Sequence, residues 1–183
     1  MEKSRSGKNL KNTRDRVNVK EIAMCGLFVA VALIFSYVES LLPLPMPVPG
    51  FKLGFANIAI ISVLYFYSVK EAFFVNVVRI ILAALLFGHG NVQQFFFSLA
   101  GGMASLGVMA LLKRFDKFSV IGVSVVGGVV HNIAQVLIAI LILSSVSIGY
   151  LIPVFIVIGV VTGIIAGIAA KAFLKHIKNL NES

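Results

Sequence analysis

Six long apolar runs constrain the fold of this 183-residue chain more than any other feature of its sequence. Hydrophobic residues make up 59% of the chain and charged residues only 13%, about half the charged share of an average soluble domain. A water-soluble fold of this size could not bury so much apolar surface. Because the runs are continuous rather than alternating, they predict transmembrane helices and not the strands of a barrel. We therefore expect an all-α membrane protein, a bundle of six transmembrane helices with spans at Ile22–Leu42, Leu53–Ser68, Ala72–Phe87, about Gln94–Leu112, Phe118–Leu143 and Tyr150–Ala170.

The six runs form one expected domain at residues 21–176. A basic N-terminal extension at 1–20, which we expect to be mobile, precedes this domain, and a short tail at 177–183 follows it. The single cysteine, Cys25, excludes a disulfide framework or a cysteine metal site within one chain.

The net charge of +9 is concentrated where membrane topology would place it. Seven of the 16 Lys and Arg residues lie within 1–20 and three within 171–183, and with six spans these ends fall on one side of the membrane. Lys70 and the Lys113–Lys117 turn fall on the same side, whereas the opposite side carries Lys52. Because cytoplasmic loops are enriched in Lys and Arg, we expect a multi-pass protein of the cytoplasmic membrane with both termini in the cytoplasm. This distribution indicates contact with anionic lipid rather than with nucleic acid.

Polar residues inside the predicted spans need a separate explanation, because an ionisable group there costs about 2.5–3.5 kcal/mol on insertion scales. Nearly all of them map to the middle or the outer half of the bundle. We expect them to line a polar pocket that opens outward beneath the proline-rich segment Pro43–Gly50, which could act as a lid or as a connector. The candidate ligand-binding residues are Glu39, Lys52, Asn57, Arg79, Asn91, Gln94, His131, Asn132 and Gln135.

The charges in this set sum to +1 and would suit a ligand with an anionic or strongly hydrogen-bonding group. The alternative is structural: Glu39 would pair with Lys52 or Arg79, and the amides would join helices. Asn76 lies one turn from Arg79 on the same helix face, and His131 and Gln135 share a face of the fifth span.

Small residues recur at helical spacing and allow helix backbones to approach closely. We interpret most of them as packing residues within the bundle: Gly159, Gly163 and Gly167 on the sixth span, Gly101, Gly102 and Ser105 on the fourth, and Ser124 and Gly128 on the fifth. Gly26 and Ala30 form a further small pair on the first span.

Catalytic motifs are absent from the sequence. It contains no phosphate-binding P-loop and no Ser-His-Asp set at one depth, and its two aspartates, Asp15 and Asp116, are far apart. Since no carboxylate cluster could hold magnesium, we expect no catalytic residues, no metal, no cofactor and no enzymatic activity.

Three segments carry a family resemblance: Glu39–Asn57 with its prolines, Ser98–Gly102 followed by Ser105, and His131-Asn132 with Gln135. Over roughly residues 20–175 the chain resembles the Gx transporter family, also known as heptaprenyl diphosphate synthase component I. That family is similar to the substrate-binding S components of energy-coupling factor (ECF) transporters.

The resemblance implies a six-helix bundle that binds a small metabolite or vitamin from outside, in the outer half and beneath the first external loop. It also implies docking on a membrane coupling subunit driven by two ATPase subunits, with Gly26 and Ala30 as the best match to the docking face on the first helix. Two other functions remain open: a non-catalytic membrane partner of an isoprenoid, quinone or redox complex, and a stand-alone secondary carrier.

Overall fold

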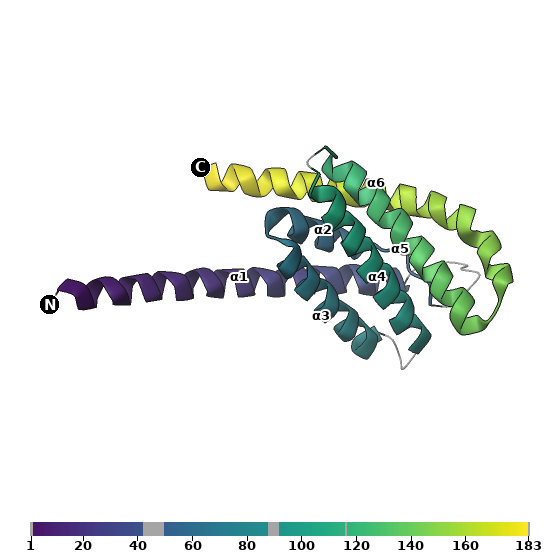
Figure 1. Cartoon of the computed structure of the whole chain (residues 1–183), viewed down its shortest axis with the longest axis horizontal. Coiled ribbons are helices and arrows are strands. Elements are labelled where there is room, and N and C mark those ends of the chain that lie inside the picture. The colour runs from purple at the N-terminus through teal and green to yellow at the C-terminus, as the bar shows by residue number, and fades with distance from the viewer. Residues whose placement is uncertain (1, 42–49, 88–91, 116, 183) are drawn as a thin grey trace.

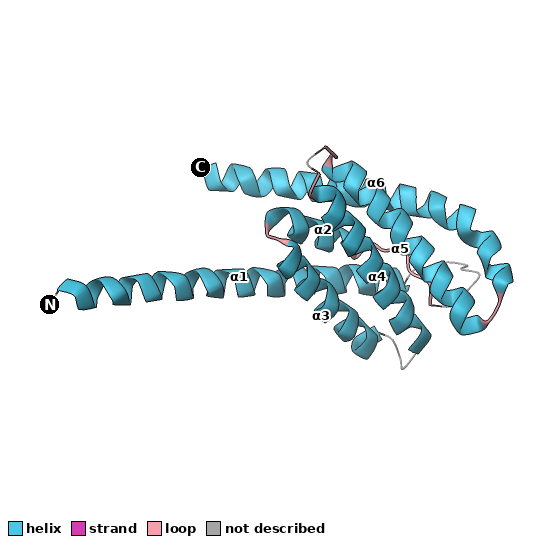
Figure 2. Cartoon of the chain, in the orientation of Figure 1, coloured by secondary structure: helices cyan, strands magenta, loops and turns pink. Residues whose placement is uncertain are grey.

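The described part of the chain folds into a bundle of helices. The computed structural model describes residues 2–41, 50–87, 92–115 and 117–182. All regular structure within these ranges is helical, which confirms the predicted all-α class (Figure 2). The elements are α1 (Glu2–Leu41), α2 (Asn57–Phe66), α3 (Val69–Phe87), α4 (Val92–Lys113), α5 (Val120–Leu143), the short 3₁₀ helix η1 (Val146–Leu151) and α6 (Ile152–Glu182).

In the part of the chain that the structure describes, four stretches of helix are long and apolar enough to cross a membrane: Glu21–Leu41, Val92–Lys113, Val120–Leu143 and Val146–His176. Large apolar side chains cover the outside of the bundle. Leu85 and Leu141, for example, are 75% and 72% exposed. A soluble monomer rarely exposes apolar surface on this scale, whereas a lipid-facing surface requires it. The chain is therefore an integral membrane protein.

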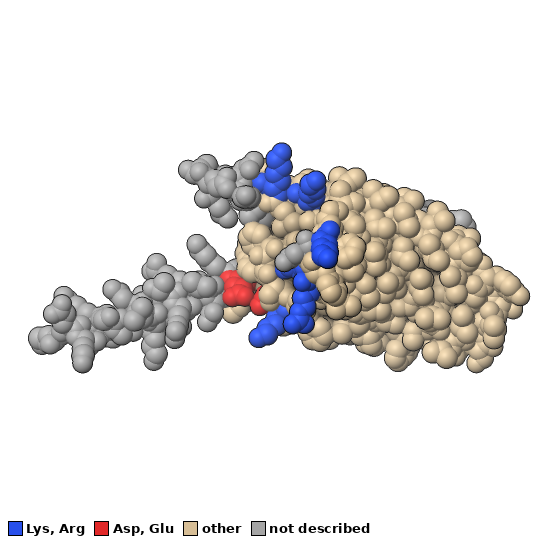
Figure 3. Space-filling view, turned by 45° about the horizontal axis from the view of Figure 1, so that its top comes forward, with Lys and Arg blue, Asp and Glu red and all other residues tan. Residues whose placement is uncertain are grey.

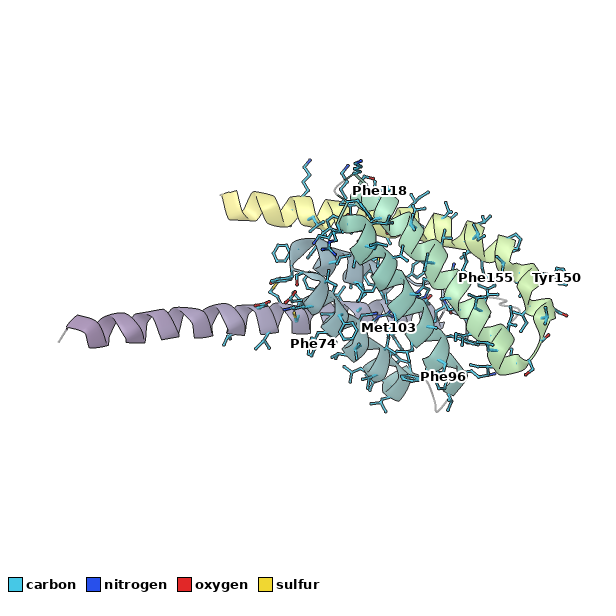
Figure 4. All side chains as sticks on the ribbon, in the orientation of Figure 1. Phe74, Phe96, Met103, Phe118, Tyr150 and Phe155 are labelled. Carbon is cyan, nitrogen blue, oxygen red and sulfur yellow. The ribbon has the colours of Figure 1, made fainter. Side chains whose placement is uncertain are left out.

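The two ends of the bundle differ in charge. Both termini leave the bundle at the same end (Figure 1). Lys and Arg side chains gather around that end, which we call the basic end, and the rest of the visible surface of the bundle is largely uncharged (Figure 3). The opposite end, the distal end, contains Leu41, Gly50 and η1, and Tyr150 projects from it into the surroundings (Figure 4).

Residues 2–20, expected as a separate extension, have a helical backbone that is continuous with the first span (Figure 1). Together they form α1, a helix of 40 residues. At a rise of 1.5 Å per residue, α1 is about 60 Å long and extends well beyond the bundle.

The second predicted span differs most from the structure. Instead of a helix over Leu53–Ser68, α2 has only ten residues, about half of what crossing a bilayer requires. Gly50 and Gly54 have φ angles of +92° and +88°, in the left-handed region that glycine tolerates best, so a right-handed helix cannot include them. Residues 51–56 therefore form a non-helical segment, which we call the entry segment. Phe51, Lys52 and Ala56 within it are buried.

Helices α5 and α6 form the closest contact of the bundle through their glycines. A Cβ atom on Gly159 would lie 2.8 Å from the Gly128 carbonyl oxygen, and one on Gly163 would lie 2.6 Å from the Val125 Cα. These distances leave room for hydrogen only. The prediction that these glycines serve helix packing is confirmed.

Two apolar clusters fill the core. The larger one lies toward the basic end and includes Phe28, Ile60 and Met109. The smaller one lies toward the distal end, where Phe51 stacks between Phe97 and Phe155, with ring centroids 5.2 Å and 4.5 Å away. The polar side chains of the candidate site occupy the helical turns between these two clusters.

Candidate functional site

The entry segment is held in the bundle by side chains from two helices. The Lys52 N–H donates to Gln135 Oε1 at 2.9 Å, and Gln135 Nε2 donates to the Lys52 carbonyl oxygen at 2.8 Å. The Gly54 N–H donates to Glu39 Oε1 at 2.8 Å. Non-helical backbone is tolerated at membrane depth only when its polar groups find partners inside the protein. Gln135 of α5 and Glu39 of α1 supply those partners.

His131 lies between two glycine backbones. A Cβ atom on Gly54 would lie 3.1 Å from His131 Cδ2, and one on Gly101 would lie 2.8 Å from His131 Cε1. A side chain at position 54 or 101 would therefore collide with the His131 ring. The His131 side chain is only 2% exposed. Gly101 and Gly102, predicted to be helix-packing residues, do lie at the contacts of α4 with α5 and α3, but the atoms they face are side-chain atoms rather than backbone. The nearest neighbour of Gly101 is the His131 ring, and those of Gly102 are Arg79, Asn76 and Ile80.

Arg79 is held by its neighbour one turn away. Its Nε and Nη2 atoms both donate to Asn76 Oδ1, at 3.2 Å and 3.0 Å. The Asn76 Nδ2 atom donates in turn to the Gly102 carbonyl oxygen at 3.0 Å and so links α3 to α4. The shared helix face of Asn76 and Arg79 was predictable from their spacing. The role of Asn76 as an anchor of the guanidinium was not, because it depends on the position of α4.

Glu39, Lys52 and Arg79 place three charged side chains inside the bundle, each at most 7% exposed. They are close enough for their charges to interact. Among the described residues, no ion pair joins the Glu39 carboxylate to Lys52 or to Arg79. The alternative, in which Glu39 forms an ion pair with Lys52 or Arg79, is therefore not found among the described residues. The three formal charges sum to +1.

Several buried polar atoms near His131 lack a partner within the described ranges. Neither ring nitrogen of His131 meets hydrogen-bond geometry with any described residue, although the Gly101 backbone lies beside the ring. Asn57 Oδ1, Ser98 Oγ and Asn132 Oδ1 are likewise unpaired. Native proteins satisfy nearly all of their buried polar groups, so such a concentration calls for an explanation. Ser98 was missing from the candidate set, although its motif had been singled out.

The remaining candidate residues lie at the edge of this cluster or outside the described ranges. Asn132 Nδ2 donates to the Phe155 carbonyl oxygen at 3.0 Å, so its amide faces α6. Gln94 lies at the distal end, where its Cβ would be 3.5 Å from a Cβ on Gly50. Asn91 and most of the proline segment, residues 43–49, lie outside the described residues.

Gly26 and Ala30 lie on the outer surface of α1. Both are exposed, and a Cβ atom on Gly26 would meet nothing within 4 Å. Packing within this chain therefore does not explain why position 26 is a glycine.

Comparison with known proteins identifies the family of this chain. The sequence profile of the family described as heptaprenyl diphosphate synthase component I matches residues 28–173. The chain belongs to this family. A search of curated proteins finds no match.

Among solved structures, this protein is similar to the S component of a bacterial ECF transporter. The TM-score is 0.70 at 16% sequence identity, and the match covers 91% of this chain and 99% of that chain. The two proteins therefore share a fold over nearly their whole lengths. Every described candidate residue except Gly26 lies within the family match.

Proposed function

We propose that this family member is the membrane-embedded, substrate-binding subunit of an uptake transporter for a metabolite or vitamin. The observation that carries the proposal is a set of polar atoms of His131, Asn57 and Ser98 that find no partner among the described residues and are buried between two apolar clusters. A bound small molecule would supply the missing hydrogen-bond partners. Ligand sites of this kind combine apolar walls with a few convergent polar groups. The fold shared with an S component supports the same function.

The charge distribution supports an orientation for this site. Lys and Arg cluster at the basic end, which we place in the cytoplasm together with both termini (Figure 3). The entry segment and the unpaired polar atoms then lie toward the outer half of the bundle, so the ligand would enter from outside the cell.

Uptake against a gradient would need partners. The sequence contains no phosphate-binding loop, so ATP hydrolysis would come from two ATPase subunits acting through a membrane coupling subunit. The exposed surface of α1 at Gly26 and Ala30 is the proposed docking face for that coupling subunit. Small residues there would let a partner helix approach closely.

A pair of serine variants tests the binding site. Ser98→Ala removes an unpaired hydroxyl, whereas Ser62→Ala removes a hydroxyl that is bonded to its own helix at Ile58 O. In a thermal-shift screen of vitamins, their precursors and isoprenoid compounds, a true ligand should raise the unfolding midpoint of the wild-type protein. Ser98→Ala should weaken that stabilisation and Ser62→Ala should preserve it. Equal stabilisation of both variants would remove Ser98 from the site. No stabilisation by any compound would count against the function itself.

The family description favours a second candidate function. The chain could be a non-catalytic membrane partner of an isoprenoid, quinone or redox complex, in which a separate subunit performs the chemistry. Mild-detergent purification from the native membrane separates the two functions. Co-purification of a coupling subunit with two ATPases supports transport, whereas co-purification of a soluble synthase or a flavoprotein supports the alternative. Under both proposals, this chain would contribute no catalytic residue, metal or cofactor to the complex.

A further inference from the structure

The Arg79 guanidinium and the Lys52 ammonium each have hydrogen-bond donors that no described residue accepts. Arg79 uses Nε and Nη2 on a single oxygen of Asn76, which leaves Nη1 without an acceptor among the described residues. The hydrogen bonds of Lys52 to Gln135 come from its backbone, so the Lys52 ammonium is also without a described acceptor. The His131 nitrogens are unpaired and fully buried, whereas Arg79 Nη1 and Lys52 Nζ are not among the fully buried unpaired atoms.

The single acidic group nearby cannot neutralise both cations. Glu39 is oriented by the Gly54 N–H, at 2.8 Å from Oε1, and forms no ion pair with Lys52 or Arg79 among the described residues. A buried site with an uncompensated positive charge is costly, most of all within a membrane. One additional negative charge, placed between the two cations, would balance the site.

We infer that the site binds one carboxylate group of its substrate, with Lys52 Nζ and Arg79 Nη1 as the donors. This inference rests on the proposed function and names the substrate class. A phosphate monoester carries about −1.5 to −2 charges at pH 7 and would leave the site with excess negative charge, whereas a carboxylate carries one. Hydrogen bonds between charged partners are about twice as strong as neutral ones. Asn57, Ser98 and His131 then remain for the uncharged part of the substrate.

Matched acid and amide probes test the inference on the purified full-length protein. The probes are nicotinate with nicotinamide, benzoate with benzamide, a panel of further monocarboxylates with their amides, and inorganic phosphate. Only the acids should raise the unfolding midpoint, in proportion to ln(1 + [L]/Kd). Amides that stabilise as well as their acids, or phosphate that stabilises better, would overturn the inference.

Charge variants sharpen the test. Lys52→Gln and Arg79→Gln should each weaken acid binding at least tenfold, and Lys52→Gln should fold normally because only the backbone of Lys52 is bonded to Gln135. Glu39→Gln keeps an oxygen for the Gly54 N–H but removes the negative charge, so it should tighten acid binding. Lys70→Gln removes the same charge as Lys52→Gln at an exposed position of the basic end and should change nothing.

The outcomes separate this inference from the proposed function. If neutral compounds stabilise the protein in a Ser98-dependent manner while acids do not, the binding subunit stands and the carboxylate assignment falls. Acid binding that survives Lys52→Gln also overturns the assignment. If no probe stabilises the protein and no coupling subunit co-purifies, both proposals fall.

Discussion

The Gln135 side-chain amide pairs with both backbone polar groups of Lys52, at 2.9 Å and 2.8 Å, across 83 residues of sequence. In a helix or a sheet, the N–H and C=O of a residue are satisfied by other backbone groups. Here the side-chain amide of Gln135 satisfies both groups of Lys52 instead. It explains how a chain can leave helical geometry inside an apolar bundle, and it fixes the backbone of Lys52 next to α5.

Replacing Gln135 should therefore destabilise the whole bundle. Gln135→Leu preserves approximate volume but leaves a buried N–H and a buried C=O of Lys52 unpaired. At about 1–3 kcal/mol for each of the two orphaned groups, we expect a loss of about 2–6 kcal/mol. Thermal unfolding in detergent measures this loss. Ser40→Ala, which removes an exposed hydroxyl bonded to Tyr37 O, is the control and should stay within about 0.5 kcal/mol of wild type. A Gln135→Leu midpoint equal to that of the control would contradict the role of the amide.

Glycine at position 54 is required for two reasons. Its φ of +88° disfavours any L side chain, and a Cβ there would lie 3.1 Å from the His131 ring and 3.2 Å from Asn57 Nδ2. Gly54→Ala should lower the free energy of unfolding by at least about 1 kcal/mol. Gly107→Ala offers a matched control, because Gly107 lies in α4 with nothing within 4 Å of its Cβ position. That control should be neutral or stabilising by up to about 1 kcal/mol, and equal effects of the two variants would refute the strain argument.

The glycine contact between α5 and α6 should not accept even a methyl group. Gly163→Ala places a Cβ 2.6 Å from the Val125 Cα, where the backbone itself must move, so a loss of about 1–3 kcal/mol is expected. Gly26→Ala makes the same change at an open helical position and should not lower the unfolding midpoint. If both variants unfold at the same temperature as wild type, the close packing of α5 on α6 is not required for stability.

At the basic end, substitutions of the adjacent residues Lys113 and Arg114 should differ sharply in their effect on stability. Lys113 Nζ donates to the Leu64 carbonyl oxygen near the end of α2 and lies 5.3 Å from the Tyr65 ring centroid. Arg114 is exposed. Lys113→Gln should lose about 1.5–3 kcal/mol, the range for a hydrogen bond to a charged group, whereas Arg114→Gln should stay near wild type. Chemical denaturation of the two variants gives the comparison, and a larger loss for Arg114→Gln would reverse the assignment.

The architecture was largely predictable from the sequence because it depends on local properties. Apolar runs of helical length indicate spans whatever they pack against, and α3, α4 and α5 begin and end within three residues of the predictions. The start of α2 was not predictable in this way. Gly54 lies in an apolar stretch that a helix could include, and the contacts that require a glycine there, with Asn57 and with His131 of a distant helix, exist only in the folded bundle.

The sequence could predict which residues belong to the candidate site, but not the role of each residue. Polar residues in apolar helices could be identified from the sequence, and the structure brings three of them, Glu39, Lys52 and His131, together around Gly54. Sequence could not distinguish side chains that hold backbone, such as Gln135, from those whose polar atoms stay unpaired, such as Ser98. That distinction depends on which helices are neighbours in space.

The bond between Gln135 and Lys52 also has a consequence for the order of events during synthesis. Once Lys52 of the entry segment has been added to the growing chain, 83 more residues must be added before its partner Gln135 exists. Until then, the Lys52 N–H and C=O have only water or lipid headgroups as partners, and neither is available in the hydrocarbon interior. The segment must therefore wait near the membrane surface and can settle into the bundle only after α5 has been inserted. The region that would capture the substrate is thus among the last parts of the nascent protein to be completed.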